Sequence, residues 1–325
     1  MSDRLVVQTQ SNELSGFDFI KIKNRIDWLA GCFELTAFNR LSVDLTRVKS
    51  AVKQGDSVKL YKDKELCLTG YVDRVETFYA GQKKGFKIIG RSKAADLTDC
   101  SAFGMVYRSR NAPEIIADLC QPFGIAVKTD LKGFARLDNF TVNPSETIGN
   151  ALARLARRTN ALLFSSADGS LCLTRRCMAK KTDLLLQSGK GGNLTGGETA
   201  FCAENEFSKV SLIGQGVLDD AHDIDAIRAP VLSAEFNDRR HRTRVVYADA
   251  VTDEALKKEI ERLNKNSRVI SLTAAGWFNV GLNTLITAHD EWLRLDGNYL
   301  VAGIEDVFDE TGGHRTTFDL EAVNA

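Results

Sequence analysis

The feature that most constrains the fold is a β-hairpin pattern that occurs twice in the chain. Each copy holds an aspartate, a strand with an internal glycine, a glycine-marked turn and a return strand with a phenylalanine. These residues are Asp56, Gly70, Gly81, Gly85 and Phe86 in the first copy and Asp290, Gly303, Gly312, Gly313 and Phe318 in the second. Aspartate and glycine lie 14 residues apart in one copy and 13 in the other, and glycine and phenylalanine lie 16 and 15 apart. The matched order indicates a duplicated β module.

The glycine inside each predicted strand indicates what shape the module takes. Glycine weakens a strand interior and is found where the strand bends or where another backbone approaches closely. Both copies place an aspartate three residues after that glycine, as Asp73 and Asp306. The sequence therefore predicts two related sheets that bend at Gly70 and Gly303, as the strands of a small barrel or sandwich do. Chance similarity between two strand-turn-strand segments is the alternative.

The periodicity of the apolar residues divides the chain into three regions. A chain of 325 residues suggests two to three domains of roughly 150 residues each. Residues 1–97 alternate apolar and polar side chains, as in "CFELTAF", which is typical of half-buried strands. Residues 98–182 change to helical spacing and predict a small α+β domain. Residues 183–325 return to strands, with a connecting excursion near 188–250 and a helix near 253–266. The predicted fold class is β-rich α+β: two related β-barrel-like domains with an inserted α+β domain.

Capping and turn residues locate two elements of the middle region. In "NPSETIGNALARLARRTN", Asn143 is a predicted N-cap, Pro144 suits the first helical position, and Glu146 follows the cap by three residues. In "ALLFSSADGSLCLTRR", the pair Asp168 and Gly169 predicts the turn of a short hairpin.

Charge and composition argue against two classes of protein. The 43 basic side chains are balanced by 43 acidic ones, whereas a protein that grips nucleic acid by its phosphates is usually clearly basic. No apolar run reaches the ~18 residues of a membrane span, and no basic face suits an anionic membrane surface. "MSDRLVVQTQ" lacks a signal-peptide pattern, so we expect the chain to fold in a cytoplasm. The 7 cysteines include no CxxC pair and are expected to be reduced.

No motif in the sequence carries a recognisable chemistry. His222 lies in "DDAHDID", whose order differs from that of a calcium-binding loop, so a solvated acidic loop is the favoured interpretation. The basic run "RRHRTR" at 239–244 lacks interleaved aromatic residues and indicates surface or interface charge. "SGKGGNLTGGE" at 188–198 lacks the spacing of a phosphate-binding loop and predicts a turn-rich connection. We predict no catalytic residue, no cofactor and no metal, while a carboxylate pair of the glycosidase type stays open.

Several stretches, in their order and spacing, resemble one protein family. The segments "GDSVKLY", "LTGYVDRVE", "FKIIGRSKAADLTDCS" and "IADLCQPFGI" are similar to the Mu-like bacteriophage tail protein P family, the baseplate hub proteins. The combination "TGYVD…GRSKAADLTDC" is a specific part of this match. "ETIGNALARLARRTNALLFSSADGSLCLTRR" and "YADAVTDEALKKEIERL…AAGW" extend the resemblance over nearly the whole chain, with the loosest match at 183–250.

The resemblance implies a structural protein of the virion with two related β-barrel-like domains per chain. Such hubs are homotrimers, so three chains supply six similar units around a central channel. A near-sixfold ring of this kind lets a threefold membrane-piercing spike join a sixfold tail tube, and DNA passes through it. The expected partners are two further copies of the chain, a tail tube protein and a spike protein. The expected location is the tail baseplate of a phage or prophage particle, after synthesis in the host cytoplasm.

The resemblance carries no catalytic residue over to this chain, and the motif residues are interpreted as structural. They are Gly70, Tyr71, Asp73, Gly90, Arg91, Ser92, Asp96 and Asp99 in the first copy of the module and Gly303 and Asp306 in the second. The glycines are expected to permit strand corners. Arg91 and the nearby aspartates are expected to form polar contacts that anchor the strand-to-helix transition, with simple solvent exposure as the alternative.

Three other functions stay open at this point. Tail tips often carry enzymes, so a tail-associated cell-wall hydrolase is one alternative. Small barrels commonly bind oligonucleotides or sugars, but the balanced charge and the missing basic-aromatic stripe argue against specific nucleic-acid binding. The hub segment of a contractile secretion-system spike shares this architecture, although a spike domain in the same chain would then be expected. We predict no stable membrane insertion for any of these.

Overall fold

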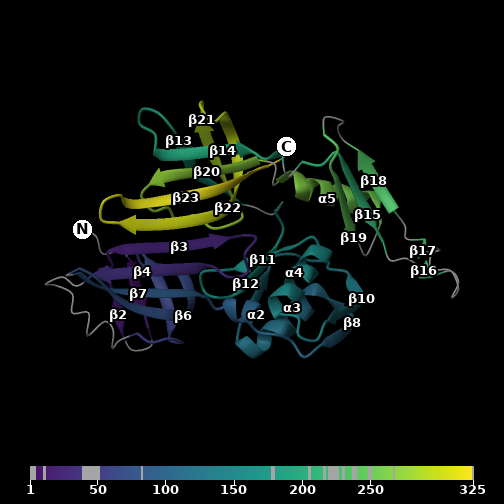
Figure 1. Ribbon diagram of the computed structural model, residues 1–325, viewed down its shortest axis with the longest axis horizontal. Coiled ribbons are helices and arrows are strands. Elements are labelled where there is room, and N and C mark those ends of the chain that lie inside the picture. The colour runs from purple at the N-terminus through teal and green to yellow at the C-terminus, as the bar shows by residue number, and fades with distance from the viewer. Residues whose placement is uncertain are drawn as a thin grey trace. The chain divides into compact units, whose positions relative to one another are not determined.

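The chain folds into two compact units in the computed structural model (Figure 1). The structure describes residues 5–9, 12–38, 52–81, 83–176, 180–203, 206–214, 217–218, 227–228, 231–235, 240–247, 251–265 and 268–323. Unit 1 comprises Met1–Gly196 and Leu272–Leu320, and unit 2 comprises Gly197–Ser271 and Glu321–Ala325. The fold is β-rich α+β, so the predicted fold class is confirmed.

The first module consists of antiparallel strands from the N-terminal part of unit 1. They are β1 (Leu5–Gln8), β2 (Glu13–Leu14), β3 (Phe19–Arg25), β4 (Cys32–Phe38), β5 (Ser57–Lys62), β6 (Glu65–Ala80) and β7 (Lys83–Ser92). β3 pairs with β4, β4 with β7, β7 with β6, and β6 with β5. Along β7 the side chains of Phe86 and Ile88 are buried, and those of Lys87 and Ile89 are half-buried. This alternation is the one expected for strands with one face on a core.

The second module is built from six of the strands that follow residue 179. They are β13 (Lys180–Gln187), β14 (Leu194–Phe201), β20 (Arg268–Ala275), β21 (Thr284–Asp290), β22 (Leu295–Asp309) and β23 (Gly313–Ala322). β14 pairs with β20, β20 with β23, β23 with β22, and β22 with β21. β13 adds to the far side of β21 in parallel.

The two modules share one strand order, both along the chain and across the sheet. Along the chain, β3, β4, β5, β6 and β7 correspond to β14, β20, β21, β22 and β23. Across the sheet, the order β3-β4-β7-β6-β5 matches β14-β20-β23-β22-β21. The earlier strands β1 and β13 also match, because each adds to β5 or β21, although β1 is antiparallel and β13 parallel to its neighbour. This topology confirms the predicted duplication. Closure of each module into a barrel stays a prediction.

One detail of the predicted repeat is wrong. Asp56 directly precedes β5, but Asp290 is the last residue of β21. The Asp290 carboxylate accepts a hydrogen bond from the backbone N–H of Leu293 at 2.8 Å and so stabilises the turn that leads into β22. The two aspartates therefore stand at opposite ends of matching strands. Gly70 and Gly303, in contrast, lie within the matching strands β6 and β22.

The modules join into one 13-stranded sheet through a single pair of strands. β22 runs antiparallel to β3, from Gly303 opposite Arg25 to Asp309 opposite Phe19. In Figure 1 the strands β20, β23, β22, β3 and β4 follow one another across this sheet. The core of the first module is also shared, because Trp277 and Phe308 of the second module pack against it.

A small α+β region lies between the modules in the chain. Its elements are α2 (Ala95–Asp99), β8 (Met105–Asn111), α3 (Ala112–Cys120), the short 3-10 helix η1 (Gln121–Phe123), β9 (Val127–Thr129), β10 (Arg136–Val142), α4 (Ile148–Arg158), β11 (Leu162–Ser165) and β12 (Leu171–Thr174). α3 and α4 bury Ile116 and Leu152 in a separate core. The predicted hairpin is confirmed: β11 pairs with β12, and Gly169 adopts a φ of +82° in the turn.

The start of α4 differs from the prediction. Its N-cap is Thr147, whose Oγ1 accepts a hydrogen bond from the backbone N–H of Asn150 at 3.2 Å. Asn143 and Glu146 instead close a turn, in which the Asn143 N–H donates to Glu146 Oε2 at 3.0 Å. Ser145 has a φ of 66°, which a right-handed helix does not accommodate. The left-handed residue therefore moves the helix start to Ile148.

The glycine-rich stretch at 188–198 is only partly a connection. Its first half is a turn, in which the backbone N–H of Gly192 donates to the oxygen of Gly189 at 3.0 Å. Its second half forms most of β14, which pairs with β20. The prediction of a turn-rich connection is therefore wrong from Leu194 onward. The ladder hydrogen bonds of β20 stabilise a strand that its composition disfavours.

Unit 2 holds a three-stranded sheet and a helix. Its elements are β15 (Lys209–Ile213), β16 (Val217–Leu218), β17 (Ile227–Arg228), β18 (Val231–Glu235), β19 (Thr243–Tyr247) and α5 (Asp253–Lys265). α5 confirms the helix predicted near 253–266 and buries Leu256 and Leu263 against Val210 and Leu212 of β15. None of the helices in the described part of the chain has the length and apolar character that a membrane crossing requires.

The predicted domain limits fall within elements. The limit at residues 97 and 98 lies in α2, and the limit at 182 and 183 lies in β13. The division into three domains remains a proposal.

Candidate functional site

The predicted motif residues of the first module surround a bulge in β6. The register of β6 on β7 shifts between the pairs Val72 with Gly90 and Arg74 with Ile89, so Asp73 is an extra residue. A bulge of this kind bends a strand and increases its twist. The bend brings two backbones together, because a Cβ on Gly70 would overlap the carbonyl of Arg91. A Cβ on Gly90 would overlap the carbonyl of Tyr71.

Arg91 holds the bulge to the helix that follows β7. Its Nε donates to Asp73 Oδ2 at 2.7 Å, and its Nη2 donates to Asp99 Oδ2 at 2.7 Å. Longer bonds of 3.2 Å join Nη2 to Asp73 Oδ1 and Nη1 to Asp99 Oδ1. The guanidinium therefore binds one carboxylate from β6 and one from the end of α2, a fork geometry that suits arginine.

The pKa values of two aspartates near Arg91 are shifted in opposite directions. Hydrogen bonds from Arg91 lower the pKa of Asp99 below its ordinary value. Burial, reinforced by the charge of Asp99, raises the pKa of Asp96. Asp96 therefore favours its neutral form more than Asp99 does.

Ser92 and Tyr71 complete the packing of this bend. Ser92 is 2% exposed, and its Oγ accepts a hydrogen bond from the backbone N–H of Gly31 at 3.2 Å. Its backbone N–H donates to the oxygen of Gly31 at 2.9 Å. Tyr71 pairs with Ser57 on one side and Arg91 on the other. These contacts fix the loop before β4 against the end of β7.

The matching aspartate of the second module has a different role. Asp306 is 6% exposed, and its Oδ2 accepts a hydrogen bond from Lys62 Nζ at 2.7 Å. Its Oδ1 accepts a hydrogen bond from Thr316 Oγ1 at 2.6 Å. Lys62 ends β5 of the first module, whereas Asp306 lies on β22 of the second. This buried ion pair therefore ties the two modules together.

Aromatic and backbone groups enclose the ammonium group of Lys62. Its Nζ donates to the backbone oxygen of Phe278 at 3.2 Å and lies 5.7 Å from the centre of the Trp277 ring. The Trp277 ring lies 4.1 Å from the ring of His314. Burial raises the pKa of the nearby Cys67 thiol to about 12, so this thiol stays protonated at neutral pH. A charge in such surroundings needs its partners, because burying an unpaired ion costs far more than burying a pair.

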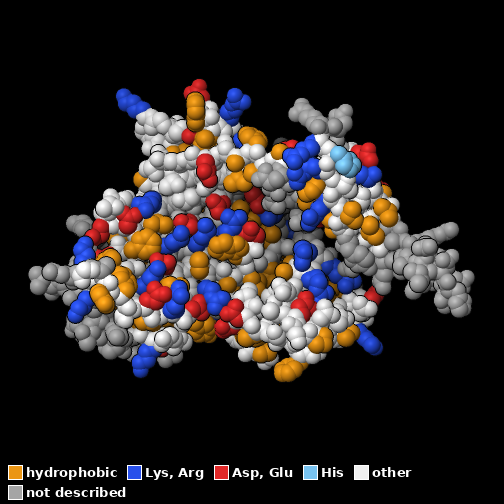
Figure 2. Space-filling model, viewed as in Figure 1, with side chains coloured by type: hydrophobic (Ala, Val, Ile, Leu, Met, Phe, Trp, Pro, Cys, Tyr) orange, Lys and Arg blue, Asp and Glu red, His pale blue; other side chains and the backbone are white. Residues whose placement is uncertain are grey.

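Charged pairs also cover the outer face of the strands that join the modules. Lys21 and Lys23 of β3 contact the carboxylate of Glu305 on β22 at 3.2 and 2.9 Å. Arg25 binds Asp319 of β23, and a Cβ on Gly303 would intrude on the Asp319 carboxylate. Figure 2 shows acidic and basic side chains interspersed over the visible face of the sheet. Gly303 therefore leaves room for an ion pair at the module junction.

The motif residues thus form two groups rather than one site. Gly70, Tyr71, Asp73, Gly90, Arg91, Ser92, Asp96 and Asp99 lie together at the first bend, and Gly303 and Asp306 lie at the junction of the modules. Lys62 and Thr316, which contact Asp306, were not predicted from the sequence. The available signal was the alternation in "SVKLYK", in which Lys62 falls on the same face of the strand as the apolar Val58 and Leu60.

The weaker sequence candidates add no chemistry to this picture. Residues 219–226, which include His222, lie outside the described residues. In the basic run, Arg242 and Arg244 lie 5.3 and 6.0 Å from the ring of Phe207. Three or more His, Cys, Asp or Glu side chains do not gather into a metal site among the residues that the structure describes.

Two family models match consecutive parts of the chain. The model described as "Mu phage baseplate assembly protein GpP-like, N-terminal" matches residues 4–92. The model described as "Baseplate hub protein gp44-like, second domain" matches residues 94–175. Their matches meet at the end of β7, between the bend and α2.

Individual proteins show the same relationship. The baseplate hub protein gp44 of Escherichia phage Mu is 27% identical over 282 residues, which cover 82% of this chain and 72% of that protein. The 43 kDa tail protein of prophage MuSo2 from Shewanella oneidensis has a crystal structure with a TM-score of 0.80 and 24% identity, covering 98% and 97% of the two chains. The tail protein of Neisseria meningitidis MC58 gives a TM-score of 0.82 at 16% identity, covering 99% and 97%.

The fold and these matches define a structural protein of a phage tail. The two crystal structures show the likeness of the fold, and the family models with the phage Mu relative show the likeness in sequence to Mu-like baseplate hub proteins. The role of the chain is that of a structural hub component. The family resemblance found in the sequence is thereby confirmed.

Proposed function

We propose that three copies of this chain form a ring that joins the tail tube to the spike and lines the channel for DNA. The duplicated module carries this proposal. A ring of three chains with two modules each presents six similar units, so one face suits a sixfold tube and the other a threefold spike. Closed rings of identical chains use heterologous contacts that return to the first chain.

The ring is proposed to work without catalysis and without specific binding of nucleic acid. The support comes from the structural role of the family and from the balance of 43 basic and 43 acidic side chains. DNA that passes through a channel must not bind tightly to it, and a chain without net positive charge has no overall attraction for the phosphates. The protein is proposed to be made in the host cytoplasm and to act in the tail baseplate.

Light scattering on a size-exclusion column tests the ring. The expected mass is near three times 35.8 kDa. A monomer at every concentration, in the presence of the spike protein as well as alone, would contradict the proposal. A turbidity assay on bacterial cell walls tests the absence of catalysis, and clearing of the suspension would favour a hydrolase instead.

A further inference from the structure

The strand β6 extends past its neighbour β5 and leaves one edge unpaired. β5 pairs with β6 only from Glu65 to Tyr71, and backbone bonds from Gly55 and Asp56 continue this contact to Val72. From Arg74 to Ala80, β6 pairs with β7 on one side. No strand in the described part of the chain pairs with the other side of this segment.

The matching strand of the second module shows what such an edge binds. β22 pairs with β21 from Leu295 to Leu300, and it then continues beyond the end of this pairing. Its segment Gly303–Asp309 pairs with β3, the strand that opens the first module. The strand that corresponds to β3 in the second module is β14. β14 ends the strand order of the sheet, and beyond β20 it has no strand partner among the described residues.

We infer that the free edge of β6, from Arg74 to Ala80, pairs with β14 of a second copy of this chain. This contact would repeat between chains the β22–β3 contact that joins the modules within one chain. The inference rests on the proposed ring and names the surfaces that close it. Because β6 and β14 are different strands, the contact is heterologous, and its repetition generates a ring rather than an isolated pair.

The backbone of β6 presents the atoms that this pairing needs. Ser92, the last residue of β7, donates its N–H to Gly31 on the β4 side, and the next residue, Lys93, donates its N–H to Thr69 of β6. Odd-numbered residues of β7 therefore bond to β6, and hydrogen-bonded pairs alternate along antiparallel strands. After the bulge, the residues of β6 that lie opposite odd-numbered residues of β7 are even-numbered, as in Arg74 opposite Ile89. The even-numbered residues of β6 therefore bond to β7. The N–H and C=O groups of Val75, Thr77 and Tyr79 thus face the free edge.

The backbone of β14 offers the complementary groups. Ala275 of β20 donates its N–H to Asn193, and Thr195 Oγ1 donates to Thr273 of β20 at 3.2 Å. If this alternation continues along β14, the backbone N–H and C=O groups of its odd-numbered residues face β20, and those of Gly196 and Glu198 face the free edge.

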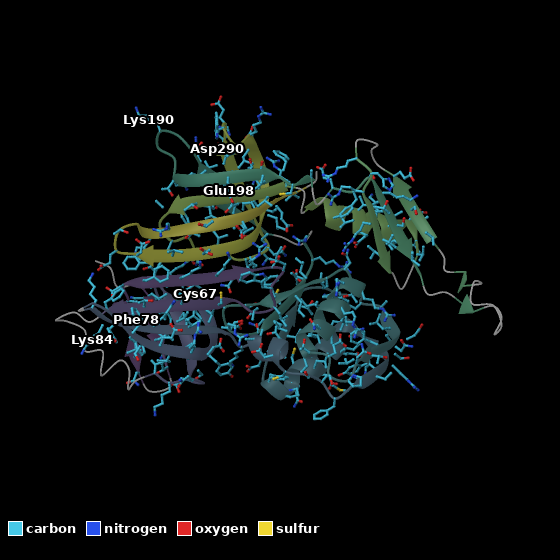
Figure 3. All side chains as sticks on the ribbon, in the orientation of Figure 1. Cys67, Phe78, Lys84, Lys190, Glu198 and Asp290 are labelled. Atoms are coloured by element: carbon cyan, nitrogen blue, oxygen red, sulfur yellow. The ribbon has the colours of Figure 1, made fainter. Side chains whose placement is uncertain are left out.

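The exposure of the β6 edge agrees with this partner. Tyr79 is 81% exposed, and Phe78 and Lys84 lie at the end of the β6–β7 hairpin (Figure 3). Soluble proteins usually protect a long open edge with proline, inward charges or a covering segment. Arg74 on this edge is paired with Glu76 of the same strand at 3.0 Å, so the charges of the β6 segment balance and do not oppose a neighbouring strand.

A proline at Thr77 tests the contact without breaking a bond inside the chain. The Thr77 N–H faces outward, and a strand edge tolerates proline where its N–H would point to solvent. Thr77→Val is the matched control, because it keeps the N–H and the β-branched shape. We expect wild type and Thr77→Val to be trimers by light scattering and Thr77→Pro to be a monomer with an unchanged circular dichroism spectrum.

A mixing experiment identifies β14 as the partner strand. Glu198→Pro blocks the other edge, so we expect it to be a monomer as well. A mixture of Thr77→Pro and Glu198→Pro retains one intact β6 edge and one intact β14 edge. It should give a dimer of mass near twice 35.8 kDa and no trimer. A mixture that stays monomeric contradicts the pairing of β6 with β14.

The outcomes separate this inference from the proposed ring. A wild-type monomer that stays monomeric with the spike protein overturns the ring, and the inference falls with it. A trimer that persists in Thr77→Pro overturns the inference while the ring stands. If Thr77→Pro does not fold, hydrogen exchange on the wild-type trimer decides: the amides of Val75, Thr77 and Tyr79 must be protected, and rapid exchange there contradicts the inference.

Discussion

Two glycines at the bend of the first module tolerate no side chain. An alanine Cβ at Gly90 would overlap the Tyr71 carbonyl and contact the ring of Phe33. We expect Gly90→Ala to lower the free energy of unfolding by about 1 to 3 kcal/mol, because neither the backbone nor a buried ring can yield. Urea unfolding measures the change. Gly281→Ala is the control, since its Cβ would meet only Thr284 at 3.9 Å, and an equal loss there would contradict the steric account.

The buried pair of Lys62 and Asp306 carries the largest predicted effect of a single side chain. Asp306→Ala leaves the ammonium of Lys62 buried without its carboxylate. We expect a loss of about 3 to 5 kcal/mol in the free energy of unfolding, and the double variant Lys62→Met/Asp306→Leu should recover part of it. Chemical denaturation of the single and double variants measures both values.

The pair of Lys87 and Glu34 is the matched control for that experiment. It joins β7 to β4 at 2.7 Å, but its side chains are 27% and 33% exposed. Glu34→Ala should cost only about 0 to 1 kcal/mol. Equal losses in the free energy of unfolding for Glu34→Ala and Asp306→Ala would contradict the account, because the buried lysine should need its carboxylate more than the exposed one does.

The Arg91 fork makes a prediction about pH. Hydrogen bonds from Arg91 lower the pKa of Asp99 in the folded state. A lowered pKa contributes stability above the ordinary aspartate pKa, and this stability is lost as the pH falls through the folded-state value. We expect Arg91→Met to raise the pKa of Asp99 toward its ordinary value, as measured by NMR titration. Arg74→Met, which removes a nearby arginine outside the fork, should leave the pKa of Asp99 unchanged.

At the scale of elements, the start of α4 shows how one residue moves a helix boundary. Thr147 caps the helix, while Asn143 lies in the turn before it. Thr147→Ala should lower the free energy of unfolding by about 1 kcal/mol, and thermal or urea unfolding measures this. Thr147→Ser keeps the acceptor oxygen and should restore most of the loss. A larger loss for Asn143→Ala than for Thr147→Ala would contradict the observed cap.

The strands of the repeat were predictable because their pattern is local. Alternation, internal glycines and turn glycines located β6, β7, β22 and β23 from the sequence. A further signal was available in "LTA", which occurs at Leu35–Ala37 of β4 and again at Leu272–Ala274 of β20. In both strands the leucine and the alanine are buried.

The missed features depend on contacts between distant residues. β14 is rich in glycine and becomes a strand through its pairing with β20, which follows it by more than 60 residues. The partner of Asp306 is 244 residues away in the sequence. The left-handed φ of Ser145 also has no clear sequence signal, since serine lacks the conformational freedom of glycine. Tertiary contacts override local preference at each of these places.

At the scale of the whole molecule, one strand order occurs twice, and one strand pair joins the two copies. The β22–β3 pairing gives the chain a contact between its own modules. In the proposed ring, the edges of β6 and β14 would repeat this contact between chains, and three chains would present six similar units through one kind of interface.

Electron microscopy of the assembled particle tests this central claim most directly. Class averages viewed along the ring axis should show six similar lobes around a central hole, with a strong sixfold component superimposed on exact threefold symmetry. A ring with only three lobes, or a compact trimer without a hole, would contradict the account even if the mass in solution corresponded to three chains.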